Sequence, residues 1–403
     1  MILKRYLLYF GIRIFFIFLI ANFYAPRDFE YGEIARNIIA GNGFSRASTT
    51  ETTPVPASSH APLYPFFLAF FYQFGNKLGI YLLIQIIQTI ISTFTILLIF
   101  RTTRLIFNES SARIAEFFTG LYPPLIYYCT KFVPTTIFLF LLSLTIYQIL
   151  NTRDRVLIHY LFAGAIAGLT ILCDPVAMVI YPALFFWFLI NKKINFFRMV
   201  FIIISSLVVL IPWTIRNYNI HKRIIPVTTQ FAVNLWIGNN PNATGTDYYK
   251  IKSFEKEDYV LMTQTLPSNI KDSLSKVSEI ESMNFYLNES LKFIKKEPSK
   301  FISLLFKKFY YYFWFAPSSE YSSKDLEHFR ILFYILYLPL LITGIAGVLF
   351  SIKDRKDVLL ILLCIFFISF IYIFTHVGLI RYRLPLELYL LIFSAYFVKS
   401  LRK

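Results

Sequence analysis

Three carboxylates follow the first apolar segment of the chain, where they could do chemistry at a membrane surface. Asp28, Glu30 and Glu33 come shortly after the apolar run from Tyr6 to Phe23. A solvated loop is one explanation for them. The other is that one carboxylate accepts a proton from a substrate held at the membrane surface, as a general base does.

Asp28 also stands at the start of an expected helix. From Tyr31 to Ile39 apolar side chains recur at helical spacing, so an amphipathic helix is predicted that ends at Gly41 or Gly43. An Asp before such a helix commonly caps it, which contributes about 1 kcal/mol. Asp28 is therefore either a helix cap or the candidate catalytic base.

A set of cationic and ionisable side chains is predicted on the same side of the membrane as Asp28. Arg grips phosphate with a planar, bidentate fork, so together they would suit an anion at membrane depth. Taken singly, each could instead extend to lipid headgroups. The candidate substrate-binding residues are His60, Lys131, Arg216, His376, Arg381 and Arg383, together with Glu30, Tyr31 and Asn217.

The composition is that of a polytopic membrane protein. Of 403 residues, 57% are hydrophobic and 16% are charged, whereas a soluble domain carries about 25% charged residues. The net charge of +17 is assigned to cytoplasmic loops rather than to a nucleic-acid-binding face. The cysteines Cys129, Cys173 and Cys364 share no ligand spacing, so they predict neither disulfides nor a metal site.

Ten segments approach the roughly 20 residues that a membrane-spanning helix needs. The connections on one side are basic, which places both termini in the cytoplasm and the carboxylates and cations named above on the extracytoplasmic side. Arg13 lies inside the first span and must snorkel or face a polar interior. Residues 62–75 are expected on the outer surface. The predicted spans are 6–24, 79–100, 112–128, 133–150, 157–172, 176–190, 198–216, 327–350, 357–376 and 384–398.

The spans divide the chain into three parts. Residues 1–216 form a transmembrane module that includes the first extracytoplasmic loop, 25–61. Residues 217–326 form an extracytoplasmic segment with interfacial helices, among them the aromatic and basic stretch Phe301–Pro317. Residues 327–403 form the C-terminal transmembrane helices.

Three motifs carry a resemblance to a known family. The most specific is "PWTIRN" followed by "NLWIGNNP", within Ile211–Thr246; the others are "D..Y..IARNI..GNGF" at Asp28–Phe44 and "RYRLPLE" at Arg381–Glu387. Their order resembles that of bacterial GT-C membrane glycosyltransferases. These are similar to glycosyltransferase family 39 and include the dolichyl-phosphate-mannose–protein mannosyltransferases and the lipid A aminoarabinose transferases.

The resemblance implies an all-α polytopic membrane protein with a GT-C-like fold, about ten transmembrane helices and a small extracytoplasmic domain. It implies a bacterial inner or plasma membrane, with the active site on the extracytoplasmic side. It also implies that Asp28 is the general base, that the donor is a sugar on a polyprenyl phosphate, and that basic residues hold the phosphate. The first seven helices form the shared module of this family. Seven spans are likewise predicted before residue 217.

The expected chemistry needs few groups. An inverting transfer requires one base near the acceptor, and a phosphate leaving group is already a stable anion that cations can neutralise. No metal and no other cofactor is therefore expected, the lipid-linked sugar being a co-substrate.

Two departures from the family pattern concern the site. Asp174 stands where relatives usually have a basic residue before a proline, so it either alters the donor pocket or pairs with Lys131 or an outer Arg. The acidic residue often found before the fourth span is also missing, and Glu30 or Glu33 could replace it.

The sequence thus predicts a membrane glycosyltransferase that passes a sugar from a polyprenyl-phosphate donor to a lipid A, polysaccharide or protein acceptor of the cell envelope. Membrane lipid is the other expected partner, and nucleic acid is not one. Two alternatives stay open: a flippase or transporter of the same lipid-linked sugar, and a non-catalytic subunit of an envelope polysaccharide assembly complex. The identities of the sugar and the acceptor, and the oligomeric state, do not follow from the sequence.

Overall fold

Long helices make up most of the protein. The computed structural model describes residues 2–20, 23, 26–47, 53–75, 78–152, 156–191, 196–246, 248–252, 257–314, 324–352, 357–377 and 380–401. Each of the ten predicted spans falls on a helix or on two consecutive helices. They are α1 (Ile2–Ile20), α4 (Leu78–Ile106), α5 (Glu109–Leu121) with α6 (Pro123–Tyr128), α7 (Thr135–Asn151), α8 (Leu157–Cys173), η1 (Pro175–Val179) with α9 (Ile180–Ile190), α10 (Phe196–His221), α15 (Lys324–Ser351), α16 (Val358–Phe374) and α17 (Leu384–Ser400).

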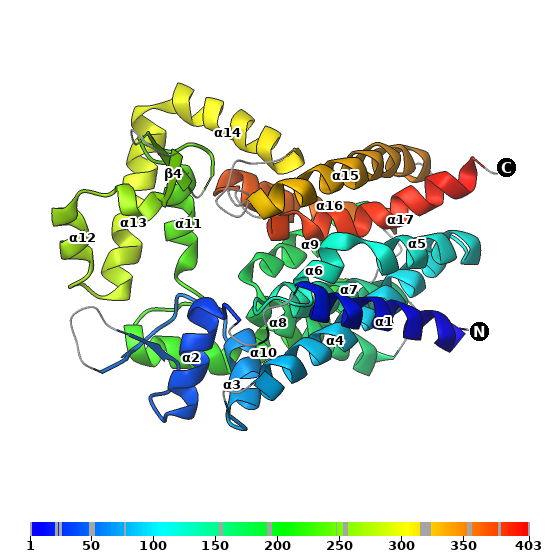
Figure 1. Cartoon of the computed structure of the whole chain (residues 1–403), viewed down its shortest axis with the longest axis horizontal. Helices are drawn as coiled ribbons and strands as arrows, with labels where there is room; N and C mark the ends of the chain where they lie inside the picture. The colour runs from blue at the N-terminus through cyan, green and yellow to red at the C-terminus, as the bar shows by residue number, and fades with distance from the viewer. Residues whose placement is uncertain are drawn as a thin grey trace.

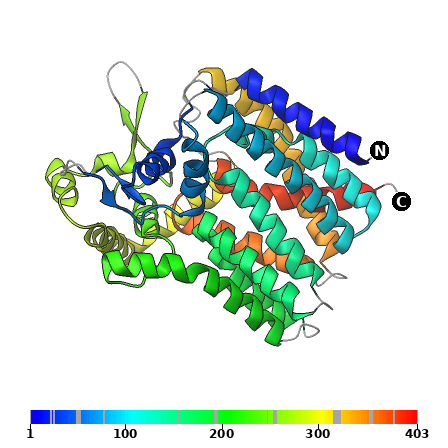
Figure 2. The same cartoon turned by 90° about the horizontal axis from the view of Figure 1, so that it is seen from below.

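These helices lie side by side in one bundle (Figures 1 and 2). Both ends of the chain lie at one end of the bundle. The opposite end carries α2 (Phe29–Ile39), α3 (Leu63–Tyr72) and the segment from α11 (Gln230–Gly238) to α14 (Pro298–Phe313). The first loop and the long segment after α10 are therefore on the same side, opposite to the termini, as the charge pattern predicts.

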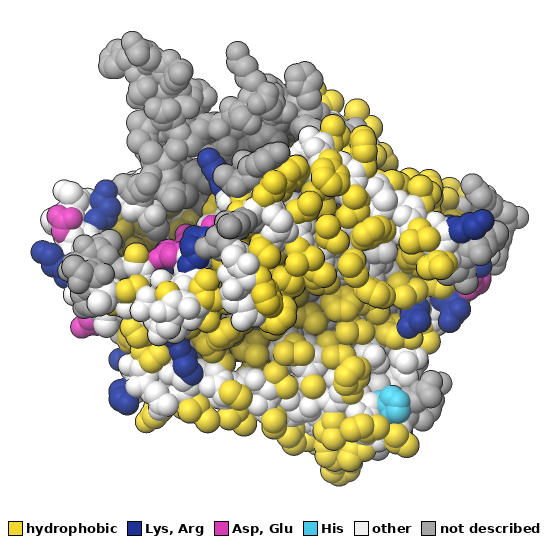
Figure 3. All heavy atoms as spheres, turned by 60° about the horizontal axis from the view of Figure 1, so that its bottom comes forward, with side chains coloured by type: hydrophobic (Ala, Val, Ile, Leu, Met, Phe, Trp, Pro, Cys, Tyr) yellow, Lys and Arg dark blue, Asp and Glu magenta, His cyan; other side chains and the backbone are white. Residues whose placement is uncertain are grey.

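The bundle has the surface of a membrane protein. Three described helical segments are long and apolar enough to cross a bilayer, namely Leu78–Ile106, Phe196–His221 and Tyr334–Ser351, and several shorter helices are apolar as well. Large side chains such as Phe15 on α1, Val208 on α10 and Ile342 on α15 are more than half exposed. On the face in Figure 3, hydrophobic side chains form a wide band with charged ones toward its two ends. Such a band suits contact with lipid tails.

Helix α3 accounts for the short apolar segment that was expected on the outer surface. Its 10 residues rise about 15 Å, half the roughly 30 Å thickness of a hydrocarbon core. It packs against α2 and α4, and Phe66, Phe70 and Phe74 are exposed along one side of it and the turn that follows. The structure therefore agrees with a surface helix rather than a crossing.

The segment after α10 is small and mostly helical. It contains α11, η2 (Met262–Thr265), α12 (Ser268–Leu274), α13 (Glu279–Lys296) and α14. Helix α14 exposes Ile302, Phe306 and Phe309, in agreement with the predicted interfacial helix, whose last residues, 315–317, lie outside the described ones. Two short antiparallel hairpins were not foreseen: β1 (Ser45–Arg46) with β2 (Val55–Pro56), and β3 (Tyr248–Lys252) with β4 (Glu257–Leu261).

Arg13 faces the interior of the bundle and is fully buried. Its guanidinium donates to the Ser92 hydroxyl of α4 at 3.0 Å and to the carbonyls of Gly120 at 2.8 Å and Thr119 at 3.4 Å. Those carbonyls belong to the last turn of α5, which lacks the donors of a helix interior; the Tyr122 N–H reaches the Thr119 carbonyl only at 3.4 Å. The negative end of the α5 dipole also favours a cation there. Arg13 thus connects α1 to α4 and α5.

Replacing Arg13 with Met should lower the free energy of unfolding in detergent by about 2–3 kcal/mol, because the carbonyls of α5 lose a charged donor. The measurement is a denaturant titration followed by circular dichroism. Arg104→Met is the matched control, since the side chain of Arg104 is 58% exposed, and it should change the free energy by less than about 0.5 kcal/mol. Equal losses in the two variants would contradict the role given to Arg13.

Candidate active site

Asp28 occupies the N-cap position of α2, but its side chain makes no capping hydrogen bond. Only its backbone carbonyl serves the helix, by accepting from the Gly32 N–H at 2.9 Å. Phe29, the next residue, has a φ of 48°, a left-handed conformation that is costly for a bulky residue. The expected capping role of the Asp28 side chain is therefore wrong, because the carboxylate is turned elsewhere.

The Asp28 carboxylate is held by one hydroxyl and one cation. The Tyr72 hydroxyl at the end of α3 donates to Oδ2 at 2.9 Å. Arg36 forms an ion pair with the same oxygen, and its second nitrogen lies 3.4 Å from Oδ1. Oδ1 therefore has the longer contact of the two carboxylate oxygens, and the side chain is 14% exposed.

The spacing along α2 makes this pair possible. Residues 28, 32 and 36 are four apart and lie on one face of a helix. Gly32 lies between the partners, and a Cβ built on it would be only 1.8 Å from Asp28 Oδ2. The missing side chain leaves room for the carboxylate to fold back toward Arg36. Arg36 was not among the sequence candidates, although this spacing could have revealed it; Tyr72, 44 residues away, has no such signal.

The ring of Tyr31, in the helix that follows Asp28, contacts aromatic and polar residues from other parts of the chain. The Tyr31 ring meets the Tyr64 ring edge to face at 5.4 Å and the His60 ring at 5.1 Å. Burial raises the pKa of Tyr31, whereas the nearby Arg381 lowers it and Asp174 raises it. Tyr31 thus lies within electrostatic reach of residues from two other parts of the chain.

Asp174 follows α8 and lies within electrostatic reach of Arg381. Burial raises the pKa of Asp174 to about 6, while the Val176 N–H and the charge of Arg381 act to lower it. The Val176 N–H donates to Asp174 Oδ1 at 3.1 Å. One of the partners considered from the sequence, an outer arginine, therefore acts on Asp174 through its charge.

Both candidate histidines are neutral at pH 7. Burial lowers the pKa of His60 to about 4, and Arg46 and Arg381 act in the same direction, against Glu30. Burial also lowers the pKa of His376 to about 4. Each can exchange hydrogen bonds with a ligand, but neither is a cation there.

Lys131 lies in the turn between α6 and α7. Its ammonium stands over the Tyr127 ring, 4.4 Å from the centroid, and its backbone carbonyl accepts from Gln88 at 2.9 Å. The described contacts place it with α4 and α6.

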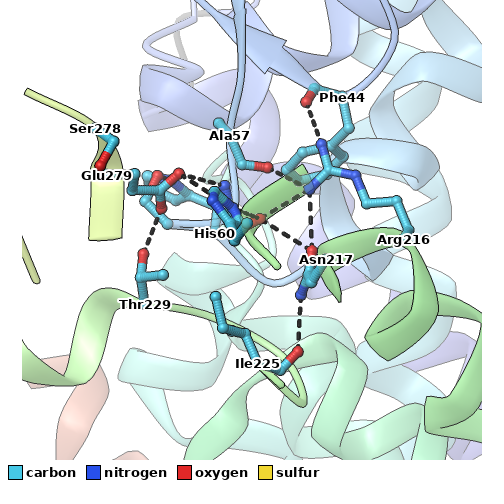
Figure 4. Close-up of polar contacts among 12 residues, drawn as sticks. Phe44, Ala57, His60, Arg216, Asn217, Ile225, Thr229, Ser278 and Glu279 are labelled. Atoms are coloured by element: carbon cyan, nitrogen blue, oxygen red, sulfur yellow. Dashed lines mark hydrogen bonds and ion pairs between the residues drawn. The ribbon is translucent and has the colours of Figure 1, made fainter. Parts of the chain in front are cut away.

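Arg216 binds the first loop of the same chain (Figure 4). It donates to the carbonyls of Ala57 at 2.6 Å and Phe44 at 2.7 Å, and to the Ser58 hydroxyl at 2.8 Å. Its guanidinium also lies over the Trp213 ring, 4.7 Å from the centroid. These contacts occupy guanidinium N–H groups of Arg216 that would otherwise be available to bind a phosphate.

Asn217 and Glu279 complete this attachment. Asn217 accepts from the Ser58 hydroxyl at 2.9 Å and donates to the Ile225 carbonyl at 3.0 Å. Glu279 of α13 accepts from the Ser58 N–H at 2.8 Å and from the Thr229 hydroxyl. The "PWTIRN" motif therefore pins the loop that carries Asp28 to α10 and, through Glu279, to α13 (Figure 4).

Arg383 also has protein partners. It forms a buried ion pair with Glu387 one turn later in α17 and donates to the Trp314 carbonyl after α14. The Tyr122 hydroxyl donates to the same Glu387 at 2.8 Å.

Arg381 differs from Arg216 and Arg383. Within the described part of the chain it makes no ion pair within 4.0 Å, and its guanidinium lies over the Tyr382 ring, 5.4 Å from the centroid. Its side chain is partly accessible, although its neighbours include Tyr31 and Tyr128 from elsewhere in the chain. Among the described residues, no group of three or more His, Cys, Asp or Glu side chains could hold a metal ion.

Comparison with known proteins identifies the fold. Residues 59–215 match the family model described as dolichyl-phosphate-mannose-protein mannosyltransferase. The structure aligns with ArnT from Cupriavidus metallidurans bound to undecaprenyl phosphate at 11% identity and a TM-score of 0.59, covering 98% of this chain and 59% of that one. The chain has a GT-C-like fold. The resemblance seen in the motifs is thereby confirmed.

A second enzyme shares the GT-C-like fold. The apo oligosaccharyltransferase of Archaeoglobus fulgidus aligns at 12% identity and a TM-score of 0.58, over 98% of this chain and 50% of that one. The same archaeal enzyme, AglB, in complex with an inhibitory peptide and a dolichol-phosphate, aligns at 12% identity and a TM-score of 0.51, over 92% and 45%. The chain thus spans about half to three fifths of these proteins. Comparison with curated protein sequences finds no match.

Gly32→Ala should destabilise the protein, although alanine usually stabilises a helix by about 1 kcal/mol relative to glycine. The new Cβ would displace the Asp28 carboxylate from Arg36 and Tyr72. The measurement is the thermal unfolding midpoint in detergent. Gly11→Ala in α1 is the control, because a Cβ there meets nothing within 4 Å, and it should leave the midpoint equal or higher. A rise with Gly32→Ala would show that the carboxylate does not occupy this space.

Proposed function

We propose that this protein is a membrane glycosyltransferase that transfers a sugar from a polyprenyl-phosphate donor to an acceptor of the cell envelope. The observation that carries the proposal is the Asp28 carboxylate. It caps no helix, it is oriented by Tyr72 and Arg36, and it keeps one oxygen with room for a proton. The GT-C-like fold and the family match over residues 59–215 support the same function.

In the proposed reaction Asp28 is the general base. The acceptor hydroxyl or amine attacks the anomeric carbon of the donor sugar and loses its proton to Asp28 Oδ1. A new bond forms at that carbon as the bond to the phosphate oxygen breaks on the opposite face, so the configuration inverts. The leaving phosphate keeps the electron pair and needs no general acid, provided that a cation neutralises its charge.

Arg381 is the proposed ligand of the donor phosphate. It lies within electrostatic reach of Tyr31 in α2, the helix that follows Asp28, and its guanidinium is not committed to a carboxylate among the described residues. Arg216, Asn217 and Arg383 act in this proposal by positioning, since their donors bind the protein itself. His60, His376, Glu30 and Tyr31 remain candidates for the sugar or the acceptor, and Lys131 for the carrier.

The apolar surface of the bundle supports a lipid-linked donor. The structural relatives were solved with undecaprenyl phosphate and with a dolichol-phosphate, and a carrier of that kind would place its isoprenoid tail against the exposed apolar side chains of the spanning helices. A glycan, a lipid or a protein is the proposed acceptor, and the site is proposed to be extracytoplasmic, at the bundle end opposite to the termini (Figure 1).

Asp28→Asn should lower the rate of sugar transfer at least about a hundredfold, because the isosteric amide cannot accept the proton. In the source bacterium, a deletion strain is complemented with the natural gene or with the Asp28→Asn gene at equal membrane abundance. Mass spectrometry of envelope glycans should show one sugar missing in the Asp28→Asn strain and its polyprenyl-phosphate form accumulating. The missing sugar identifies the substrate.

Glu289→Gln is the matched control, a carboxylate-to-amide change in α13 at a side chain that is 40% exposed and pairs with Lys292 at 3.2 Å. It should restore the natural glycan profile. If Asp28→Asn also restores that profile, Asp28 is not the base, and transport of the lipid-linked sugar becomes the better explanation.

Asp174 should make donor binding depend on pH. With a pKa of about 6, its carboxyl is neutral at pH 5 and charged at pH 7, where its charge opposes a phosphate beside Arg381. The affinity for a polyprenyl-phosphate sugar, a phosphodiester that does not titrate in this range, should fall roughly fivefold from pH 5 to pH 7, about 1 kcal/mol.

The dissociation constant is measured in detergent by thermophoresis at both pH values. Asp174→Asn should remove most of the difference, since the pKa of the buried Lys308, about 7, is also close to this range. His60→Gln should keep it, since the pKa of His60, about 4, lies below the range. A pH step that survives at full size in Asp174→Asn would assign it to another group.

A further inference from the structure

The ammonium of Lys308 is surrounded by four oxygen atoms, called here the Lys308 oxygen cluster. It is fully buried in α14, and its ammonium lies 3.0 Å from Asn239 Oδ1, 3.0 Å from the Phe374 carbonyl, 3.1 Å from the Thr375 carbonyl and 3.3 Å from the Gly238 carbonyl. No carboxylate among the described residues pairs with it within 4.0 Å.

These oxygens come from two helix ends that meet. Gly238 is the last residue of α11, and Phe374 is the last residue of α16. A Cβ on Gly238 would lie 1.6 Å from the Thr375 carbonyl oxygen, so the two backbones are in direct contact. Carbonyls at helix C-termini have no intrahelical donor and carry partial negative charge. Two such ends repel each other unless a cation lies between them.

The Lys308 ammonium supplies that charge. It has three hydrogens to donate and no lone pair to accept with, which matches a site made only of acceptors. Asn239 assists through its amide, which donates to the Phe374 carbonyl at 3.0 Å. Burial lowers the pKa of Lys308 to about 7, whereas acceptor oxygens around an ammonium favour its charged form.

The end of α16, which Lys308 binds, comes shortly before the proposed phosphate ligand Arg381 in the chain. His376 and Val377 follow Thr375, and the Val377 N–H donates to the Gly245 carbonyl at 3.3 Å beyond α11. The chain then reaches η4 (Ile380–Tyr382), which contains Arg381. The position of Arg381 therefore depends on where α16 ends.

We propose that Lys308 is a positioning residue for donor binding: by bridging the C-terminal ends of α11 and α16, its ammonium fixes where α16 ends, and this end precedes Arg381 in the chain. The inference rests on the proposed function. Lys308 touches neither the donor nor the acceptor in this arrangement. Its effect on binding passes through the position of the end of α16.

The test measures binding of undecaprenyl phosphate to the full-length protein in detergent, without any transfer step. Lys308→Met keeps the length of the side chain but removes the charge, and it should weaken binding at least tenfold. Lys300→Met is the matched control: Lys300 is on the same helix and donates to the Pro241 carbonyl at 2.8 Å, but its side chain is 45% exposed. It should change the dissociation constant by less than twofold.

Chemical rescue separates positioning by charge from general packing. Lys308→Ala removes three methylene groups and the ammonium, and n-propylammonium contains the same atoms. Adding n-propylammonium to Lys308→Ala should restore most of the binding, while n-propanol, of the same shape but uncharged, should not. If Lys308→Ala is unstable, it is purified with the amine, which is then removed by buffer exchange. A folded, monodisperse protein that has lost binding supports the proposal.

Three results would overturn it: unchanged binding in Lys308→Met, equal rescue by n-propanol, or loss of binding only together with unfolding. The two proposals can fail separately. A natural protein that binds undecaprenyl phosphate but transfers no sugar would refute the transferase proposal and leave this one intact. Equal binding by the natural protein and Lys308→Met would refute the Lys308 proposal and leave the transferase proposal intact.

Discussion

The structure depends on one constraint: carbonyl groups at helix ends and in buried loops must find donors where water is scarce. Buried or half-buried cations meet this need repeatedly. Arg13 binds the end of α5, Lys308 binds the ends of α11 and α16, Arg383 binds the residue after α14, and Arg216 binds the carbonyls of the first loop. An unpaired buried carbonyl costs about 1–3 kcal/mol, and the negative end of a helix dipole attracts a cation. Each of these side chains also joins elements that are distant in the sequence. Arg13 joins helices within the bundle, whereas the other three hold the bundle to the segments at the end opposite to the termini.

Two of these contacts divide the candidate site between them. The Arg216 cluster, with Asn217 and Glu279, fixes the loop that follows α2 and therefore the half of the site that carries Asp28. The Lys308 oxygen cluster fixes the end of α16 and therefore the half of the candidate site that carries Arg381. Tyr31 lies between the halves, one helical turn beyond Asp28 and within electrostatic reach of Arg381. The base and the phosphate ligand of the proposed reaction are thus held independently, and the distance between them is set by how α10 and α16 pack into the bundle.

Hydropathy was enough to predict where the helices of the bundle lie, because a helix that meets lipid must be apolar over its full length. The side that each helix end faces stays a prediction from the flanking charges. The surface position predicted for α3 rested on its short apolar run and on the charges of the later loops, and its 10 residues agree with it. The roles of individual charges could not be predicted in the same way. An Arg near a helix end gives the same sequence pattern whether it binds a phosphate or a carbonyl. Only the fold shows that Arg216 and Arg383 bind carbonyls. For Asp28 the local pattern suggested a cap, and the partner that turns its carboxylate away, Tyr72, is supplied by a different helix. Arg36 was within reach of the sequence, since Asp28, Gly32 and Arg36 share one helical face.

The pairing of Asp28 with Arg36 and Tyr72 sets a limit on how the proposed base can act. Both partners bind Oδ2, and only the second Arg36 nitrogen lies near Oδ1, at 3.4 Å, so the carboxylate is held in one orientation. In the proposed reaction the acceptor oxygen becomes acidic as it bonds to the anomeric carbon, and the phosphate departs without needing a proton. Orientation of the base is then the main requirement, and Tyr72, Arg36 and the bare backbone of Gly32 supply it. The other requirement is a cation that neutralises the leaving phosphate. In the proposal Arg381 meets it, since Arg381 makes no ion pair among the described residues.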